Sequence, residues 1–204
     1  GGYSDFMFLR VNTIIENTMV EGPGNRTSIF VQGCLKHCIG CNSPQTWDLD
    51  GGILYDVKKL AKNILKNKDI EGVTFSGGEP FLQSKALGEL AVILHDNGLS
   101  IVTFTGYTYD IIRKINCSNW NKLLSQTDIL ISGFFNQDKI TYKKPWIGSL
   151  NQKYHFLTDK YSYLENNLDS IENKIEIRLN KDGSFVVNGM GNNKEIRKLF
   201  ENMM

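Results

Sequence analysis

The sequence lacks a dominant charge, a membrane-length apolar run and a disulfide framework. Its 204 residues include 23 basic and 22 acidic side chains, so no broad basic field favours nucleic acid as a partner. No apolar run reaches the roughly 20 residues that a membrane-spanning helix needs, and the amino end shows no signal-peptide pattern. Only four cysteines are present, three of them clustered, which favours a reducing cytoplasm. These absences predict a cytoplasmic protein that binds neither nucleic acid nor membrane.

The composition is that of an ordinary globular protein, with 41% apolar and 22% charged residues. The length is sufficient for one full core and too short for two ordinary domains. We therefore expect a single domain over 1–204, with a core at about 21–159 and a C-terminal extension at about 160–204. The sequence assigns no role to this extension.

Apolar periodicity predicts strands that alternate with helices. The expected strands are 6–15, at the edge of the fold, and 27–32, 73–76, 100–104, 128–132 and 154–157; the expected helices are 56–68, 84–97, 109–115, 120–124 and 161–171. The alternation predicts an α/β fold with a parallel sheet, whose ligand loops gather at the carboxyl ends of the strands. Residues 174–187 predict a β-hairpin with an Asp-Gly turn, and 193–203 a closing helix.

The most informative stretch holds Cys34, Cys38 and Cys41 in the spacing C-x3-C-x2-C. Thiolates this close must repel one another or share a cation, and thiolate sulfur is the usual ligand of iron–sulfur clusters and of zinc. A structural zinc site normally has four ligands in two pairs. No second cysteine pair follows here, although His37 lies within the loop. Three ligands favour a four-iron cluster with one open iron, and zinc is the weaker alternative.

A second motif, Val-Thr-Phe-Ser-Gly-Gly-Glu-Pro at 73–80, ends the next predicted strand of the core. Glycines let a backbone approach a ligand closely, and the carboxylate of Glu79 can accept hydrogen bonds from an ammonium group. The alternative is an ordinary strand-to-helix turn in which Glu79 favours the first turn of the helix. The motif is weak alone and gains weight from the cysteines before it.

Together the two motifs resemble those of the radical S-adenosylmethionine (SAM) superfamily. Further stretches are similar to the activating proteins of anaerobic ribonucleotide reductase and to related glycyl radical enzyme activases: 21–34, Gly40-Cys41, 45–47, 105–109 and 146–152. The resemblance implies a partial (β/α)6 barrel, open on one side, with a [4Fe-4S] cluster on the three cysteines. It also implies SAM-binding positions at Gly40, Cys41, Asn42, Gly77, Gly78, Glu79, Thr105 and Ser132, the last standing where the family usually has aspartate.

The resemblance implies that one electron from the reduced cluster cleaves SAM to a 5′-deoxyadenosyl radical, which abstracts a hydrogen atom. The favoured hypothesis is an oxidoreductase that installs a glycyl radical on an anaerobic ribonucleotide reductase or similar enzyme, with a flavodoxin-like or other one-electron donor. One alternative is direct radical modification of a peptide or small molecule, and another is a non-catalytic metal-binding module.

The polar connection 134–150 either docks the partner or packs over the barrel mouth. Arg26 either meets the cysteine loop or caps a surface.

Overall fold

The computed structural model describes residues 6–192, 195, 196, 198 and 201. The expected closing helix at 193–203 therefore lies largely outside the described residues. Within the part of the chain that is described, no helix has the length and apolar character needed to cross a membrane.

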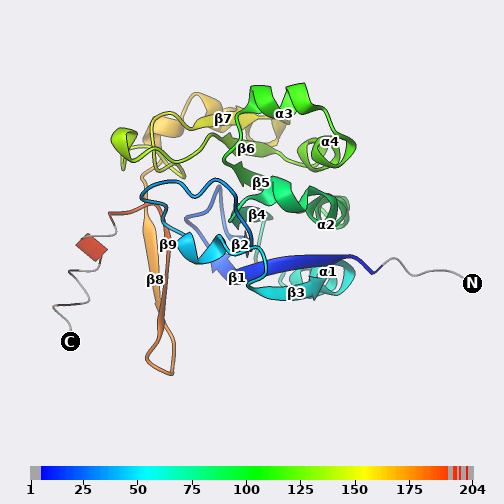
Figure 1. Cartoon of the computed structure of the whole chain (residues 1–204), viewed down its shortest axis with the longest axis horizontal. Coiled ribbons are helices and arrows are strands. Elements are labelled where there is room, and N and C mark those ends of the chain that lie inside the picture. The colour runs from blue at the N-terminus through cyan, green and yellow to red at the C-terminus, as the bar shows by residue number, and fades with distance from the viewer. Residues whose placement is uncertain (1–5, 193–194, 197, 199–200, 202–204) are drawn as a thin grey trace, which may run out of the picture.

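A seven-stranded sheet forms the centre of the fold, with the strand order β3-β1-β2-β4-β5-β6-β7 (Figure 1). Its strands are Phe8–Thr18 (β1), Arg26–Val31 (β2), Ile53–Asp56 (β3), Gly72–Gly77 (β4), Ser100–Thr105 (β5), Ile129–Ser132 (β6) and Lys153–Phe156 (β7). β1 lies second in the sheet, so the prediction that the first strand occupies the edge is wrong. The short β3, which the sequence pattern did not predict, takes the edge by pairing with residues 8–11 of β1.

The four central strands, β2, β4, β5 and β6, run parallel to one another, as the alternation of strands and helices predicts. Toward the edges the pairing is antiparallel, because β1 pairs antiparallel with both β2 and β3, and β7 with β6. The connection from β6 to β7 holds only a short 3-10 turn, Gln137–Lys139, and no crossover helix. The chain therefore re-enters the sheet from the end at which it left, which makes β7 antiparallel.

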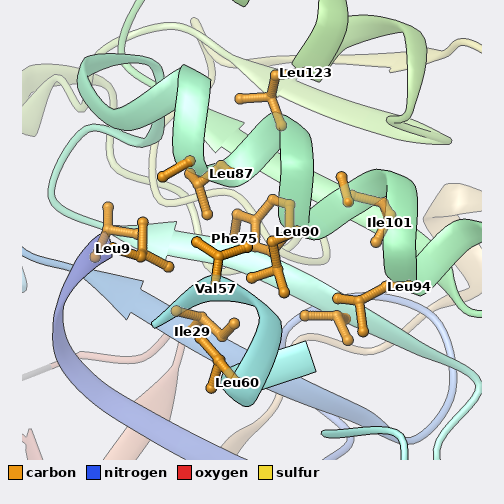
Figure 2. Close-up of a cluster of buried hydrophobic side chains, with 14 of the residues drawn as sticks. Leu9, Ile29, Val57, Leu60, Phe75, Leu87, Leu90, Leu94, Ile101 and Leu123 are labelled. Carbon is orange, nitrogen blue, oxygen red and sulfur yellow. The ribbon is translucent and has the colours of Figure 1, made fainter. Parts of the chain in front are cut away.

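Helices cover one face of the sheet. They are α1 (Val57–Ile64), α2 (Ser84–Asp96), α3 (Tyr109–Ile115) and α4 (Ser118–Ser125). Figure 2 shows Leu90 of α2 beside Phe75 of β4 and Leu60 of α1 beside Ile29 of β2, within a cluster that also includes Leu123 of α4. These side chains are nearly or fully buried, so this face carries the larger hydrophobic core of the described residues.

The opposite face carries a second apolar cluster, formed by alternate residues of β5 and β6 with part of the 134–150 connection. Val102 and Ile129 pack there with Trp146 and Tyr161. Trp146 is only 5% exposed, whereas Tyr142 in the same connection is 46% exposed. Packing over the sheet is therefore confirmed for Trp146 and Ile147, toward the end of the connection, and a docking role for its exposed residues stays a prediction.

The C-terminal extension is organised around a hairpin of β8 (Ile175–Leu179) and β9 (Phe185–Gly189), which forms a separate two-stranded sheet. The predicted hairpin is thus confirmed, with Gly183 at φ 85° in its turn. The expected helix at 161–171 is reduced to α5 (Ser162–Glu165) and a 3-10 turn, Leu168–Ser170. The pair Asn166-Asn167 separates them, and asparagine favours turns over helix interiors.

Candidate functional site

The cysteine loop, residues 33–47, leaves the carboxyl end of β2 and is closed at its base by hydrogen bonds. The Gly33 N–H donates to the carbonyl oxygen of Thr46 at 2.7 Å. The Gln32 side chain is 3% exposed, and its Nε2 donates to the carbonyl oxygen of Asp48 at 2.7 Å. These contacts hold the two ends of the loop together, so its interior turns are presented from a fixed base.

Inside the loop, His37 and Gly40 adopt the left-handed backbone conformation, with φ of 45° and 76°. The Cys41 N–H donates to the Cys38 carbonyl oxygen at 3.1 Å, which makes a tight turn around Gly40. The His37 ring stacks on Trp47 with ring centroids 4.5 Å apart. Stacking offsets part of the cost of a left-handed non-glycine residue, so the role visible for His37 is to shape the loop.

The Gly-Gly-Glu turn at the end of β4 is joined to this base. The Gly78 N–H donates to the Val31 carbonyl oxygen at 2.9 Å, and the Glu79 N–H to the Gly33 carbonyl oxygen at 2.8 Å. A Cβ on Gly78 would lie 2.3 Å from the Gly33 oxygen, and one on Gly77 would lie 2.6 Å from the Val31 nitrogen. The close approach that these glycines permit is therefore to the protein's own β2. The cysteine loop and the Gly-Gly-Glu turn form one hydrogen-bonded unit.

The Glu79 side chain is 2% exposed and is held by three donors. Its Oε1 accepts from the Phe81 N–H at 3.0 Å and from Thr105 Oγ1 at 2.8 Å, and its Oε2 accepts from the Gly106 N–H at 2.7 Å. Burial raises the pKa of this carboxyl, and the three donors act in the opposite direction. The bond from Phe81 confirms the alternative drawn from the sequence, in which Glu79 caps the turn that follows β4. Since Oε2 has a second lone pair, the carboxylate also has capacity for an ammonium ligand.

The two motifs share one cavity of about 160 Å³. Its lining brings together eight of the positions at the strand ends: Cys34, Cys38, Cys41, Gly77, Gly78, Glu79, Thr105 and Gly106. All of them lie at the carboxyl ends of β2, β4 and β5 or in the loops that follow, where parallel α/β sheets place their ligands. We call this the inner cavity.

Backbone N–H groups point at all three cysteine sulfurs: those of Lys36 and His37 at Cys34, that of Phe135 at Cys38, and that of Ser43 at Cys41. Burial raises the pKa of the Cys34 and Cys38 thiols, and these N–H donors lower it. Such donors stabilise a thiolate and tune the reduction potential of a cluster bound to it. Three half-buried thiols with backbone donors fit an iron–sulfur cluster.

Among the described residues, no group of three or more His, Cys, Asp or Glu side chains is placed to hold a metal ion. A closed zinc site would require its ligands to surround one point. In a cluster each thiolate takes a separate iron corner, so the sulfurs need not surround a single point. A cluster on the three cysteines is compatible with thiols that do not surround one point.

The remaining predicted positions lie farther out. Asn42 lines both the inner cavity and a larger adjoining cavity, whereas Gly40 lines only the larger one. Ser132 is 3% exposed, and its Oγ lies 2.8 Å from His155 Nε2. Ser132 is absent from the lining of either cavity, so a cofactor role for it stays a prediction.

Arg26 neither meets the cysteine loop nor caps a surface, so both alternatives drawn from the sequence are wrong. It begins β2, so it lies at the opposite end of that strand from the cysteine loop, and its side chain is fully buried. Its guanidinium donates to Thr74 Oγ1 at 2.9 Å, to the Ser100 carbonyl oxygen at 3.0 Å and to the Tyr161 hydroxyl at 3.3 Å. Burial lowers the pKa of this guanidinium, while Tyr161 and Glu71 raise it. The sequence could not reveal this role, because the partners are distant along the chain.

The chain is similar to known proteins over most of its length. The family described as "4Fe-4S single cluster domain" matches residues 20–155. The chain is 32% identical over 140 residues to a pyruvate formate-lyase-activating enzyme of Clostridium pasteurianum, a match that covers 66% of this chain and 56% of that protein. It is 33% identical over 147 residues to the anaerobic ribonucleoside-triphosphate reductase-activating protein of Enterobacteria phage T4, covering 69% and 89%. The solved structure of QueE from Escherichia coli is 21% identical, with a TM-score of 0.43 over 50% of this chain and 53% of that one, a likeness too weak to support an inference.

Proposed function

Because this chain belongs to the 4Fe-4S single cluster domain family and, within it, to the radical SAM activating enzymes, we propose that it cleaves SAM reductively to install a glycyl radical on a partner enzyme. The chain is an enzyme of that family, whose cofactors are a [4Fe-4S] cluster and SAM. The observation that carries the proposal is the single cavity that joins three cysteine thiols to the Gly-Gly-Glu turn.

In this proposal Cys34, Cys38 and Cys41 would hold the cluster. When bound, the cluster and SAM supply a one-electron cleavage of a carbon–sulfur bond and the hydrogen-abstracting radical that follows. The protein binds, orients and excludes water. Glu79 would accept a hydrogen bond from the ammonium of the methionine half, and Gly77 and Gly78 would line the same cavity beside it.

Placement of the reacting groups is the main contribution that the chain itself makes. The hydrogen bonds between the Gly-Gly-Glu turn and the base of the cysteine loop fix the two motifs relative to each other. Close and fixed geometry converts an encounter into an effectively intramolecular step, and it also keeps a reactive radical from attacking other groups. Phe104 and Phe135 in the lining limit the access of water.

The substrate in this proposal is the Cα–H of a glycine on a flexible loop of an anaerobic ribonucleotide reductase or a similar glycyl radical enzyme. The names of the relatives support this class of partner. The exposed side chains of the 134–150 connection that face away from the cavities, among them Leu150, are candidates for the docking rim. A flavodoxin-like or other one-electron donor completes the set of partners.

The fold supports the same proposal at a finer level. Four parallel strands with their ligand loops at one end are compatible with a shortened (β/α)6 barrel that is open on one side. The second apolar cluster packs on the same sheet as the first, which supports a single domain over 1–204.

The proposal is tested by replacing one ligand and one control cysteine. Cys38→Ala should abolish four-iron loading and the formation of 5′-deoxyadenosine on reduction, because the cluster loses a ligand. Cys117→Ala should leave both unchanged, since Cys117 is an exposed thiol that does not line the inner cavity. Iron analysis, electron paramagnetic resonance and product chromatography measure the outcome. Full SAM cleavage by Cys38→Ala would rule out the cluster assignment.

A further inference from the structure

The inner cavity adjoins a larger one. The larger cavity, which we call the outer cavity, has a volume of about 480 Å³. The two share lining residues Asn42, Phe135, Gly148 and Met190. Cofactor pockets usually measure about 300–1,000 Å³. At about 160 Å³ the inner cavity is too small to bury all of SAM, and the outer cavity brings the combined space into the usual range.

The outer cavity has the chemistry of a nucleoside pocket. Its lining combines apolar and aromatic side chains with polar ones: Phe135, Ile140, Tyr142 and Met190, with Gln137 and Asp138. Aromatic rings can stack on a planar base, a side-chain amide can bond a base edge, and a carboxylate can accept bonds from ribose hydroxyls. Asp138, the one charged side chain among the lining residues, disfavours a phosphate. The lining therefore suits a phosphate-free nucleoside.

One wall of the outer cavity comes from the C-terminal extension. Residues 190–192 follow β9 directly, and all three line the cavity. They lie beyond residues 20–155, which the family match covers. Figure 1 shows the upper end of the β8–β9 hairpin reaching the blue loop after β2, while the hairpin tip points away from the sheet. The extension thus adds a wall from outside the matched residues to a pocket whose other lining residues lie within them.

Buried polar contacts fix the hairpin in this position. Glu21 Oε1 accepts from the Gly189 N–H at 2.9 Å and from Asn188 Nδ2 at 3.2 Å. Asn188 Nδ2 also donates to Thr18 Oγ1 at 2.9 Å. Glu21, Asn188 and Thr18 are all buried. A Cβ on Gly189, at φ 94°, would lie 2.4 Å from the Lys174 carbonyl oxygen, so this position requires glycine.

We propose that the C-terminal hairpin is part of the cofactor site and supplies the outer wall of the pocket for the adenosine half of SAM. Met190 contacts the adenosine, and Glu21 and Asn188 act as positioning residues that hold the hairpin against the pocket. The inference rests on the proposed function, in which the inner cavity takes the methionine half. The two halves of the cofactor are then held by parts of the chain that are distant in sequence.

The test measures the binding of each half separately on the anaerobic, iron-loaded full chain. Met190→Ala should weaken the binding of S-adenosylhomocysteine and of 5′-deoxyadenosine about fivefold to tenfold, the loss expected for one truncated apolar contact. Methionine binding should change less than about twofold, because the proposed function assigns the methionine half to Glu79 and to the Gly77-Gly78 turn and not to Met190. Tyr142→Ala, at a residue that is 46% exposed and lines only the outer cavity, should give the same split without a folding defect.

Matched controls and contrary outcomes are available on the same chain. Leu179→Ala on β8 and Tyr163→Ala remove exposed side chains that line neither cavity, and they should leave both affinities unchanged. Unchanged adenosine affinity in Met190→Ala and Tyr142→Ala would overturn the inference. Loss of affinity only for a neutral glycine-centred heptapeptide would also overturn it, because it would assign the outer cavity to the protein substrate. Either result would leave SAM cleavage, and hence the proposed function, intact.

Discussion

The two ends of the parallel strands use their polar groups in opposite ways. At the amino end, the Arg26 guanidinium donates hydrogen bonds to oxygens of the protein itself. The Tyr161 hydroxyl extends this network by donating to Glu71 Oε1 at 2.6 Å. At the carboxyl end, the cysteine thiols and part of the Glu79 carboxylate face a cavity. A buried polar group with all its partners stabilises the fold, whereas one aimed at a cavity is available to a ligand. Stability and chemistry are thus assigned to opposite ends of the same strands.

Removing the charge at the amino end should give the largest effect on stability. Arg26→Met leaves buried oxygens of Thr74 and Ser100 without their donor, so we expect the free energy of unfolding to fall by about 3–5 kcal/mol. Urea denaturation of the apoprotein measures this change in the free energy of unfolding. Arg113→Met, at an exposed position, should change stability by less than about 0.5 kcal/mol. A small effect of Arg26→Met would break the assignment of stability to this end.

A somewhat smaller effect should appear as pH dependence at Glu21. Burial raises the pKa of this carboxyl from 4.5 to about 7, with the Glu176 charge adding to the rise and the Asn188 and Gly189 bonds opposing it. Because the folded pKa exceeds the unfolded one, folding takes up a proton. The stability contributed by Glu21 is therefore full below pH 4.5 and is lost as pH rises through 7.

Comparison with Glu21→Gln isolates this contribution. The variant keeps an oxygen acceptor for Gly189 and cannot ionise, so wild type should lose about 3 kcal/mol relative to the variant between pH 4.5 and pH 8. Urea titrations at both pH values provide the measurement, and Glu16→Gln, at an exposed position, is the control. A constant difference between wild type and Glu21→Gln would show that this carboxyl keeps an ordinary pKa in the fold.

The smallest of the three changes in free energy should come from the carboxyl end. Glu79→Ala removes the charge-assisted contact that the proposed function assigns to Glu79, so SAM affinity should fall about 10- to 100-fold while iron content persists. Isothermal titration with the iron-loaded protein measures the affinity, and Glu89→Ala on α2 serves as the control. Affinity equal to wild type would leave Glu79 with its turn-starting role alone.

Local patterns predicted most of the elements because their determinants are close in sequence. The helix at 84–96 and the hairpin at 175–189 follow from apolar periodicity and from an Asp-Gly turn. Strand order was harder. The place of β1 inside the sheet depends on pairing with β3, a four-residue strand with no clear signal, and β7 runs antiparallel because no helix precedes it.

The candidate site was predictable where chemistry requires a fixed spacing, as with Cys34, Cys38 and Cys41. Contacts between distant segments were not. The buried roles of Arg26 and Glu21 depend on partners that lie far along the chain, and no local pattern marks them. Ser132 lies at a strand end as expected, but strand geometry directs its hydroxyl to His155. Successive side chains of a strand point to opposite faces of the sheet. The face on which a given side chain lies can therefore be predicted only when the register of the strand is known.

The backbone bonds from Gly78 and Glu79 to the start of the cysteine loop have a consequence for electron transfer. They tie the start of the cysteine loop to Glu79, which in the proposed function would bind the amino acid end of the cofactor. If the cysteines and Glu79 hold the cluster and SAM as proposed, the peptide chain would set the distance between these two binding sites before either cofactor binds. Little reorganisation is then left for the moment of reaction, and a substitution that loosens this junction should slow turnover even with every ligand in place.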